Sequence, residues 1–512
     1  MIDRGGTAVR PTLGAPSMFA RLARPAPRRS SDRHRSRQAL RMAAPSRDAD
    51  RPFASAILLR SLTLLMSLWL VGGPAIVVAQ DTLAPQADPR DLGLLITPGV
   101  DLVPGEDRTV LVADENGTPV VGKLQFESGE RRIVMLPSGR LTSVTANEIT
   151  PTDRPFEPVE VGALAERLVT ETFRGFKVKK TRRYLFVYNA SEEFATGTSR
   201  ILESMYPKLV SYCEKQGLAV HEAEVPLVVV MFATEDEFQT YRQMPEGVIA
   251  YYNGISNQVL MYERSKLAEV APTIAVKQAI STVAHEGVHQ VLHNIGVQPR
   301  LGRWAPWVSE GIPEYFSPTD IGRGIRWKGV GLVNDLRLHN LIEQSKEPGA
   351  NFGNGDLIRR TVTAETLDSN GYAAAWALTY FLAKHRPNEF FEYLRELARE
   401  SRPLEGESGD EQLARFTRHF GDDLAALETE MIRRVSKLPY VDPIENQPHY
   451  VVLARVGNRL MSIVTPSPAE VTKFRAQLGS QLSPAELATT QVTVDLFPTK
   501  PLAQQAAQAA LR

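Results

Sequence analysis

The chain has 512 residues, of which 43% are hydrophobic and 23% charged, so it is long enough for several domains and too apolar for a disordered protein. Its formal net charge of zero hides an asymmetry, because thirteen of the 59 basic residues but only four of the 59 acidic residues lie in residues 1–60. The rest of the chain has a net charge of −9, which argues against nucleic acid as its main partner.

Residues 1–52 are rich in arginine, proline and alanine and show neither helical nor strand periodicity. They predict a disordered leader. Alternatively, translation starts later, at Met42, which would leave a segment of ordinary length before the next feature.

Residues 53–79 predict a signal peptide or a membrane anchor. The run 61–79 carries no charge, follows arginines, is interrupted before Pro74 and ends in small residues, which is typical of a secretory signal cleaved before Gln80. An uncleaved anchor is the alternative, although this run barely reaches the length of a bilayer span. Both interpretations predict an exported protein that is periplasmic, secreted or attached to a membrane through residues 61–79.

Residues 90–155 predict a small β domain. Short runs of alternating hydrophobicity are separated by turn signals, each with glycine as its second residue. The runs are 109–113, 120–126, 132–136 and 141–144, and the turns lie at Asn116-Gly117, Ser128-Gly129 and Ser138-Gly139.

Residues 160–270 predict an α/β region. The continuous apolar run 226–233 is typical of a buried strand, and residues 199–216 have helical spacing. Two further strands are expected on either side of Asn253-Gly254. The single cysteine, Cys213, falls in the helical segment, so we expect it to pack in a core and assign it no catalytic role.

The central motif is His285-Glu286-x-x-His289, within a helix predicted for residues 273–295. Apolar residues on this helix form one stripe, and both histidines fall outside its middle. We therefore expect the helix to pack on one side and to present its histidines to a cleft on the other.

The spacing of the motif suits a metal ion. Helical residues four apart lie on one face, so His285 and His289 can bind the same ion, and Glu286 lies where it can act on a bound water. An ordinary helix with two surface histidines and a glutamate is the alternative interpretation.

A zinc site needs one more protein ligand, and residues 304–316 offer Glu310 and Glu314, again four apart. We expect Glu310 to be the third ligand and Glu314 to accept a hydrogen bond from the far nitrogen of a metal-bound histidine. A solvated acidic helix face is the alternative. Pro313 would be harmless in the first turn of a helix but would kink its interior.

Together, His-Glu-x-x-His and the following Trp307-x-x-Glu310-Gly-x-x-Glu314-Tyr315 pattern resemble the glutamate-ligand zinc peptidases, or gluzincins. This group includes thermolysin, aminopeptidase N and the peptidase MA-like families, and the chain also looks like an uncharacterised family of exported bacterial proteins with this core. The resemblance covers roughly residues 180–400.

The resemblance implies Zn²⁺ as the cofactor, a peptide or protein as the substrate, and Glu286 as the general base. It also implies a tyrosine or histidine on a later helix that stabilises the oxyanion, for which Tyr372 is the candidate, although an aromatic residue there could equally be packing. A sheet-edge strand should bind the substrate, and we expect Val259, Leu260 and Met261 to form it.

The expected fold class is α+β: a zincin-like core with a mixed sheet and the motif helix in residues 160–330, and a helical lobe in 331–440. A small α/β module is expected in 441–512. The expected function is that of an exported zinc peptidase. The alternative is an exported scaffold or binding protein with a zincin fold and a structural or vestigial zinc site.

Overall fold

The computed structural model describes residues 93–510 except 97–99, 101, 321–324 and 401–405. The predicted leader and the predicted signal peptide or anchor lie outside the described residues. Within the described part of the chain, no helix combines the length and the apolar character needed to cross a membrane.

The alternating runs after residue 100 form an antiparallel sheet in the order β5-β4-β3-β2-β6, with β1 also paired to β3. The turns predicted at Gly117, Gly129 and Gly139 are confirmed, since each glycine has a positive φ (79°, 56° and 84°) that favours glycine. The strands are β1 (Val103–Pro104), β2 (Thr109–Ala113), β3 (Pro119–Ser128), β4 (Arg131–Met135), β5 (Leu141–Thr145) and β6 (Thr150–Pro151).

A second sheet has five strands in the order β10-β11-β9-β8-β7. Its three inner strands are parallel, and both edge strands run antiparallel to their neighbours. The predicted buried strand at 226–233 is confirmed as the central β9. The strands are β7 (Lys177–Lys180), β8 (Tyr184–Tyr188), β9 (Leu227–Thr234), β10 (Ala250–Asn253) and β11 (Gln258–Arg264).

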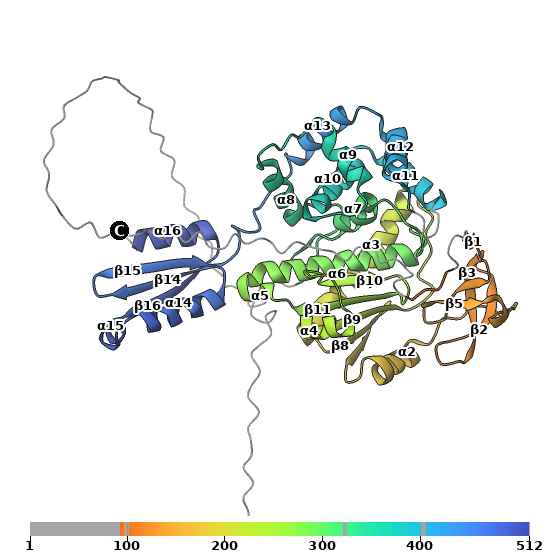
Figure 1. The fold of residues 1–512 in the computed structure, drawn as a ribbon, viewed down its shortest axis with the longest axis horizontal. Coiled ribbons are helices and arrows are strands. Elements are labelled where there is room, and N and C mark those ends of the chain that lie inside the picture. The colour runs from red at the N-terminus through yellow and green to blue at the C-terminus, as the bar shows by residue number, and fades with distance from the viewer. Residues whose placement is uncertain (1–92, 97–99, 101, 321–324, 401–405, 511–512) are drawn as a thin grey trace, which may run out of the picture. The chain divides into compact units, whose positions relative to one another are not determined.

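Helices cover both faces of this second sheet (Figure 1). Helices α3 (Glu192–Lys215) and α6 (Pro272–Asn294) pack on one face, and α2 (Val161–Arg167) and α4 (Glu235–Tyr241) pack on the other. Because strand side chains alternate between faces, Phe186 joins the core under α3 and α6, while its neighbour Leu185 joins the opposite core.

A short helix precedes α6, and a short two-stranded sheet lies between α7 (Pro306–Phe316) and α8 (Asp335–Ser345). The short helix α5 (Leu267–Val270) precedes α6, and β12 (Thr319–Asp320) pairs with β13 (Arg326–Trp327). Helix α3 begins at Glu192, seven residues before the predicted start at 199, because Ser191 caps it by accepting a hydrogen bond from the Phe194 amide.

Helices α7 to α13 of the described residues form the helical lobe. The apolar cluster beneath α6 continues into this lobe through buried aromatic residues such as Trp307 and Trp376. The helices are α7 (Pro306–Phe316), α8 (Asp335–Ser345), α9 (Asp356–Thr363), α10 (Ser369–His385), α11 (Pro387–Glu400), α12 (Gly409–Phe420) and α13 (Leu424–Val435).

The C-terminal residues form a three-stranded sheet in the order β15-β14-β16, with helices beside it, as the sequence predicts. The elements are β14 (His449–Val456), β15 (Arg459–Thr465), α14 (Pro468–Gln481), α15 (Pro484–Thr489), β16 (Gln491–Phe497) and α16 (Lys500–Ala510). The protein is thus of the mixed α+β class, with several sheets, a long helix that carries His285 and His289, and a helical lobe.

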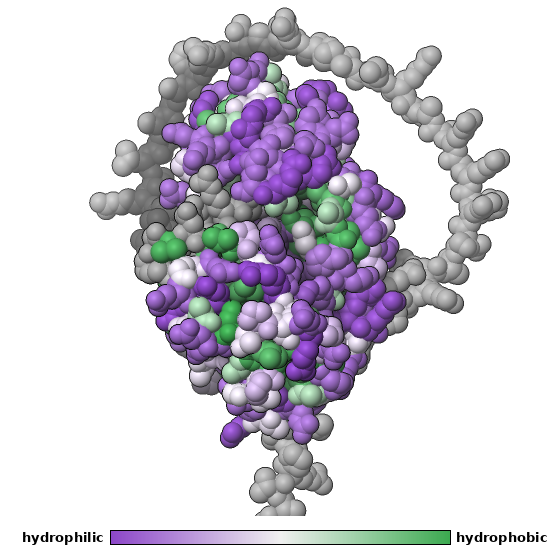
Figure 2. All heavy atoms as spheres, turned by 90° about the vertical axis from the view of Figure 1, so that its right-hand side faces the viewer, coloured by the Kyte–Doolittle hydropathy of each residue, from purple (hydrophilic) through white to green (hydrophobic). Residues whose placement is uncertain are grey.

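Hydrophilic residues prevail on the face of the molecule drawn in Figure 2, and hydrophobic residues gather there in small groups. The large apolar side chains of the second sheet and the helical lobe are mostly buried in the cores described above. Some polar and charged side chains are buried as well, among them His285, Glu286 and Glu310. Burial of such groups costs free energy unless they have hydrogen-bond or charge partners, so their contacts are described next.

Candidate metal centre

Helix α6 carries the His-Glu-x-x-His motif and spans Pro272–Asn294, one residue from the predicted range at each end. Pro272 occupies the first helical position, where its missing N–H costs nothing. Gly296 lies just beyond the end of the helix with a φ of 86°, a left-handed conformation that favours glycine and ends the helix.

The expectation that α6 buries only one side is wrong. Every residue from Thr282 to Asn294 is buried, and the exposed fractions of His285, Glu286 and His289 are 2%, 4% and 7%. One side of α6 packs on the sheet, while α7 packs against another side. The periodicity of one helix cannot reveal that a later helix covers its polar side.

Two glycines next to the candidate ligands allow this close packing. A Cβ on Gly287 would clash with the Leu202 side chain of α3, and a Cβ on Gly311 would lie 2.8 Å from the Ala375 carbonyl of α10. Pro313 lies inside α7 rather than in its first turn, yet the helix continues to Phe316.

The three predicted ligands converge on one point. His285 Nε2 lies 3.1 Å from Glu310 Oε2 and 3.2 Å from His289 Nε2, and the third side of this triangle, His289 Nε2 to Glu310 Oε2, is 3.4 Å. Tetrahedral zinc with bonds of about 2.0–2.1 Å separates neighbouring donor atoms by about 3.3 Å. Two imidazoles and a carboxylate at these distances fit a divalent ion such as zinc.

The same contacts shift the pKa values of the ligands. Burial acts to lower the pKa of His285, but its close contacts with the Glu310 and Glu314 carboxylates raise the pKa to about 10. Burial acts to raise the pKa of Glu310, yet the two histidines hold it well below its usual range. Without an ion, a proton on His285 therefore offsets part of the negative charge.

Glu286 lies beside this triangle and contacts the edge of the sheet. Its Oε2 accepts a hydrogen bond of 2.8 Å from the Tyr252 amide of β10. Burial raises the pKa of Glu286, although the neighbouring histidines act to lower it. A raised pKa makes this carboxylate a stronger base than an ordinary exposed glutamate.

The expectation that Val259, Leu260 and Met261 form the sheet edge is wrong. These residues lie in β11, which pairs with β9 on one side and with β10 on the other, so its backbone groups are already bonded. The edge strand beside Glu286 is β10. The sequence indicated the hairpin but not which of its strands faces outward.

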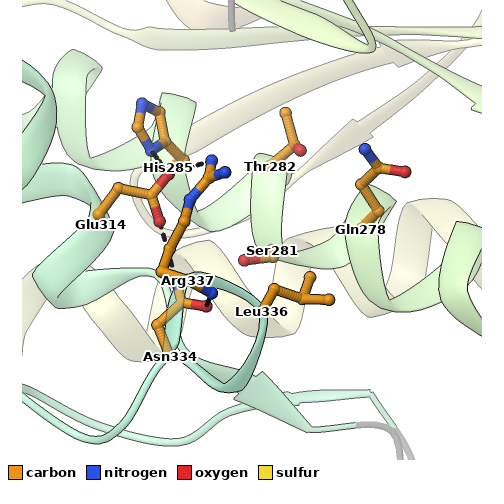
Figure 3. Close-up of a pocket in the computed structure, with 8 residues that line it drawn as sticks. All are labelled: Gln278, Ser281, Thr282, His285, Glu314, Asn334, Leu336 and Arg337. Atoms are coloured by element: carbon orange, nitrogen blue, oxygen red, sulfur yellow. Dashed lines mark hydrogen bonds and ion pairs between the residues drawn. The ribbon is translucent and has the colours of Figure 1, made fainter. Parts of the chain in front are cut away.

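Glu314 lies beside the Nδ1 atom of His285 (Figure 3), whereas the Nε2 atom of the same ring belongs to the triangle. Its Oε1 lies 3.3 Å from His285 Nδ1 and accepts a hydrogen bond of 2.6 Å from Arg337 Nη2. Its Oε2 accepts a hydrogen bond of 2.7 Å from Asn334 Nδ2. Burial acts to raise the pKa of Glu314, but Arg337 and His285 lower it to about 2.

Two further buried residues, Tyr372 and His293, lie near the candidate metal centre without being among its three candidate ligands. Tyr372, on α10, is buried, and its ring centroid lies 6.4 Å from that of His285. His293 is also buried, but its Nδ1 faces the Gln298 carbonyl at 3.1 Å and its ring stacks on Tyr252, so it is not part of the ligand triangle.

Residues 279–405 match a protein family described as "Protein of unknown function (DUF1570)". The matched segment contains the three candidate ligands as well as Glu286 and Tyr372. No curated protein matches the chain. The comparisons thus connect the candidate metal centre with a family but not with an activity.

The matched segment, residues 279–405, also contains two residues that sequence reasoning missed, Asn334 and Arg337. Asn334 gives a helix-start signal, because asparagine is a favoured cap, but nothing in the sequence shows that its side chain reaches Glu314. A third missed group is the Tyr252 amide, since backbone groups leave no sequence signal.

Binding of a divalent metal ion by His285, His289 and Glu310 is expected to release about one proton per chain at about pH 7.5. His285 carries that proton in the ion-free protein, since its pKa is about 10, and only the neutral ring can bind a metal. Affinity should therefore rise about tenfold per pH unit until the ring loses its proton. Titration calorimetry in two buffers of different ionisation enthalpy measures the release, and binding heats that do not depend on the buffer would contradict it.

Proposed function

We propose that this protein is a zinc-dependent peptidase of the gluzincin type. The observation that carries the proposal is the triangle of His285 Nε2, His289 Nε2 and Glu310 Oε2, with sides of 3.1–3.4 Å and Glu286 beside it. The motif resemblance supports the same function. The uncharged run at residues 61–79 supports export, in either a cleaved or a membrane-attached form.

Each residue would have a definite role. A bound zinc ion would supply Lewis-acid polarisation of the scissile carbonyl and of water. Glu286 would take a proton from the attacking water and deliver it to the leaving amine, with its carboxylate oriented by the Tyr252 amide. Tyr372 is the candidate hydrogen-bond donor to the developing oxyanion. An extended peptide would pair with the outer edge of β10, the edge strand of the described sheet, where the Tyr252 amide donates to Glu286.

A non-catalytic scaffold with a structural zinc site is the second candidate function. Two observations favour it: the ligands are almost fully buried, and one oxygen of Glu286 already accepts a backbone hydrogen bond. Structural zinc sites are typically closed, whereas catalytic sites keep one position open for water or substrate. The presence of Glu286 favours the peptidase, because a structural site needs no base.

Digestion of a peptide library by the full chain distinguishes the two functions. We expect cleavage that stops when a chelator removes the metal and returns when zinc is added. The zinc content of the same sample is measured in parallel. One zinc ion per chain without cleavage of any peptide would contradict the peptidase and favour the scaffold.

A further inference from the structure

The N-terminal end of α8 contacts the candidate metal centre. Asn334 caps this helix, because its side-chain oxygen accepts a hydrogen bond from the Arg337 amide. Its side-chain nitrogen donates in turn to Glu314 Oε2 at 2.7 Å. One asparagine thus fixes both the start of the helix and the orientation of the Glu314 carboxylate (Figure 3).

Arg337 binds the other oxygen of the same carboxylate. Its Nη2 donates to Glu314 Oε1 at 2.6 Å, and the arginine is only 3% exposed. Its guanidinium carbon lies 5.1 Å from the centre of the Tyr372 ring. A planar guanidinium can both pair with a carboxylate and lie over an aromatic ring, which a lysine ammonium does less well.

Arg337 also improves the charge balance of the centre. Three buried carboxylates, those of Glu286, Glu310 and Glu314, lie around His285. A divalent ion would bring two positive charges, and the permanently charged guanidinium brings the third. Buried charges are costly unless they are paired, so the arginine lowers the cost of keeping Glu314 ionised behind a metal ligand.

We infer that Asn334 and Arg337 are positioning residues that set metal affinity. They hold Glu314 in place, and Glu314 in turn orients the His285 ring from its Nδ1 side, where the two groups lie 3.3 Å apart. This inference rests on the proposed metal centre and adds to it a support in α8, a different helix from those that carry the ligands.

A purely structural role is the rival explanation, and Arg415 shows what it would look like. Arg415 is 9% exposed and pairs with Glu396, Glu400 and Glu407 without contacting the metal centre. Loss of either arginine should destabilise the fold. Only loss of Arg337 should also change metal affinity, and only while Glu314 is present to transmit the effect.

A double-mutant cycle on zinc affinity tests the inference. Competition with a chromogenic chelator gives the zinc Kd of the full chain and of R337M, E314Q and the double variant. R337M is expected to weaken zinc binding about 10–100-fold, the range typical of outer-sphere partners. In the E314Q background the same substitution should weaken it less than about threefold, because its effect runs through the missing carboxylate.

Two further variants keep the test decisive. R415M should lower the melting temperature and leave the zinc Kd unchanged. N334A supports the inference if R337M does not fold, since it removes one hydrogen bond to Glu314 and should weaken zinc binding several-fold. The inference is overturned if R337M weakens zinc binding equally with and without E314Q, or if R337M and N334A both keep the wild-type zinc Kd. Either result leaves the proposed function untouched. A wild-type chain that binds no zinc would instead overturn the proposed function.

Discussion

Replacement of Glu286 by glutamine is expected to lower kcat/KM by about 10²–10⁴-fold, the usual contribution of a general base, and to leave the zinc content unchanged. The amide cannot take up a proton, but it has the shape of the carboxylate, and its oxygen can still accept the Tyr252 amide hydrogen. The three metal ligands are untouched. The measurements are kcat/KM on a peptide found in the library digest and zinc content by elemental analysis.

The Tyr372→Phe variant provides a comparison for Glu286→Gln. Removal of an oxyanion donor costs about 10²–10³-fold in kcat, and the phenyl ring retains the packing against His285 and Arg337. Wild-type kcat in this variant would reduce Tyr372 to a packing residue. Wild-type kcat/KM in Glu286→Gln would exclude Glu286 as the base. If that variant lost zinc, its lower activity would be explained by the missing metal and would contradict the expected unchanged zinc content.

The local features of the site could be predicted from the sequence because they depend on spacing within one element. The i, i+4 spacing of His285 and His289 places both rings on one helix face, and the structure brings their Nε2 atoms to 3.2 Å. The approach of Glu310 was predicted from the third protein ligand that a zinc site needs and from the second acidic pair four residues apart, and the motif resemblance supported it. Its distance of 3.1 Å from His285 agrees with that prediction.

The predictions that were wrong, and the residues that were missed, concern contacts between elements that are distant in the sequence. Periodicity of α6 indicated an apolar stripe, but the cover that α7 provides comes from another part of the chain. Strand pairing put β10, not β11, at the sheet edge. Arg337 is 23 residues from Glu314 in sequence, and no spacing rule connects an arginine to a carboxylate on another helix.

Replacement of Glu310 by alanine is expected to weaken zinc binding by more than about 100-fold. The loss of a direct ligand should exceed the 10–100-fold cost of losing a partner outside the coordination sphere. Two imidazoles from one helix would remain, without the carboxylate that now lies 3.1 Å and 3.4 Å from their Nε2 atoms. Zinc content after dialysis against a chelator measures the effect, and an unchanged stoichiometry would exclude Glu310 as a ligand.

The stability gained from zinc should change in parallel. Zinc at 100 times its Kd stabilises the wild-type fold by about 2.7 kcal/mol, and the same zinc concentration would stabilise a variant with a 100-fold weaker Kd by only about 0.4 kcal/mol. Glu428→Ala is the matched control, because Glu428 is a buried glutamate like Glu310 but accepts backbone hydrogen bonds from Gly353 and Ile358. That variant should melt at a lower temperature and keep its full zinc-dependent stabilisation, since the lost carboxylate belongs to no metal ligand. If both Glu310→Ala and Glu428→Ala lost the zinc-dependent stabilisation, the loss would follow from removing any buried carboxylate. Glu310 is therefore a ligand only if its variant loses this stabilisation and the Glu428 variant keeps it.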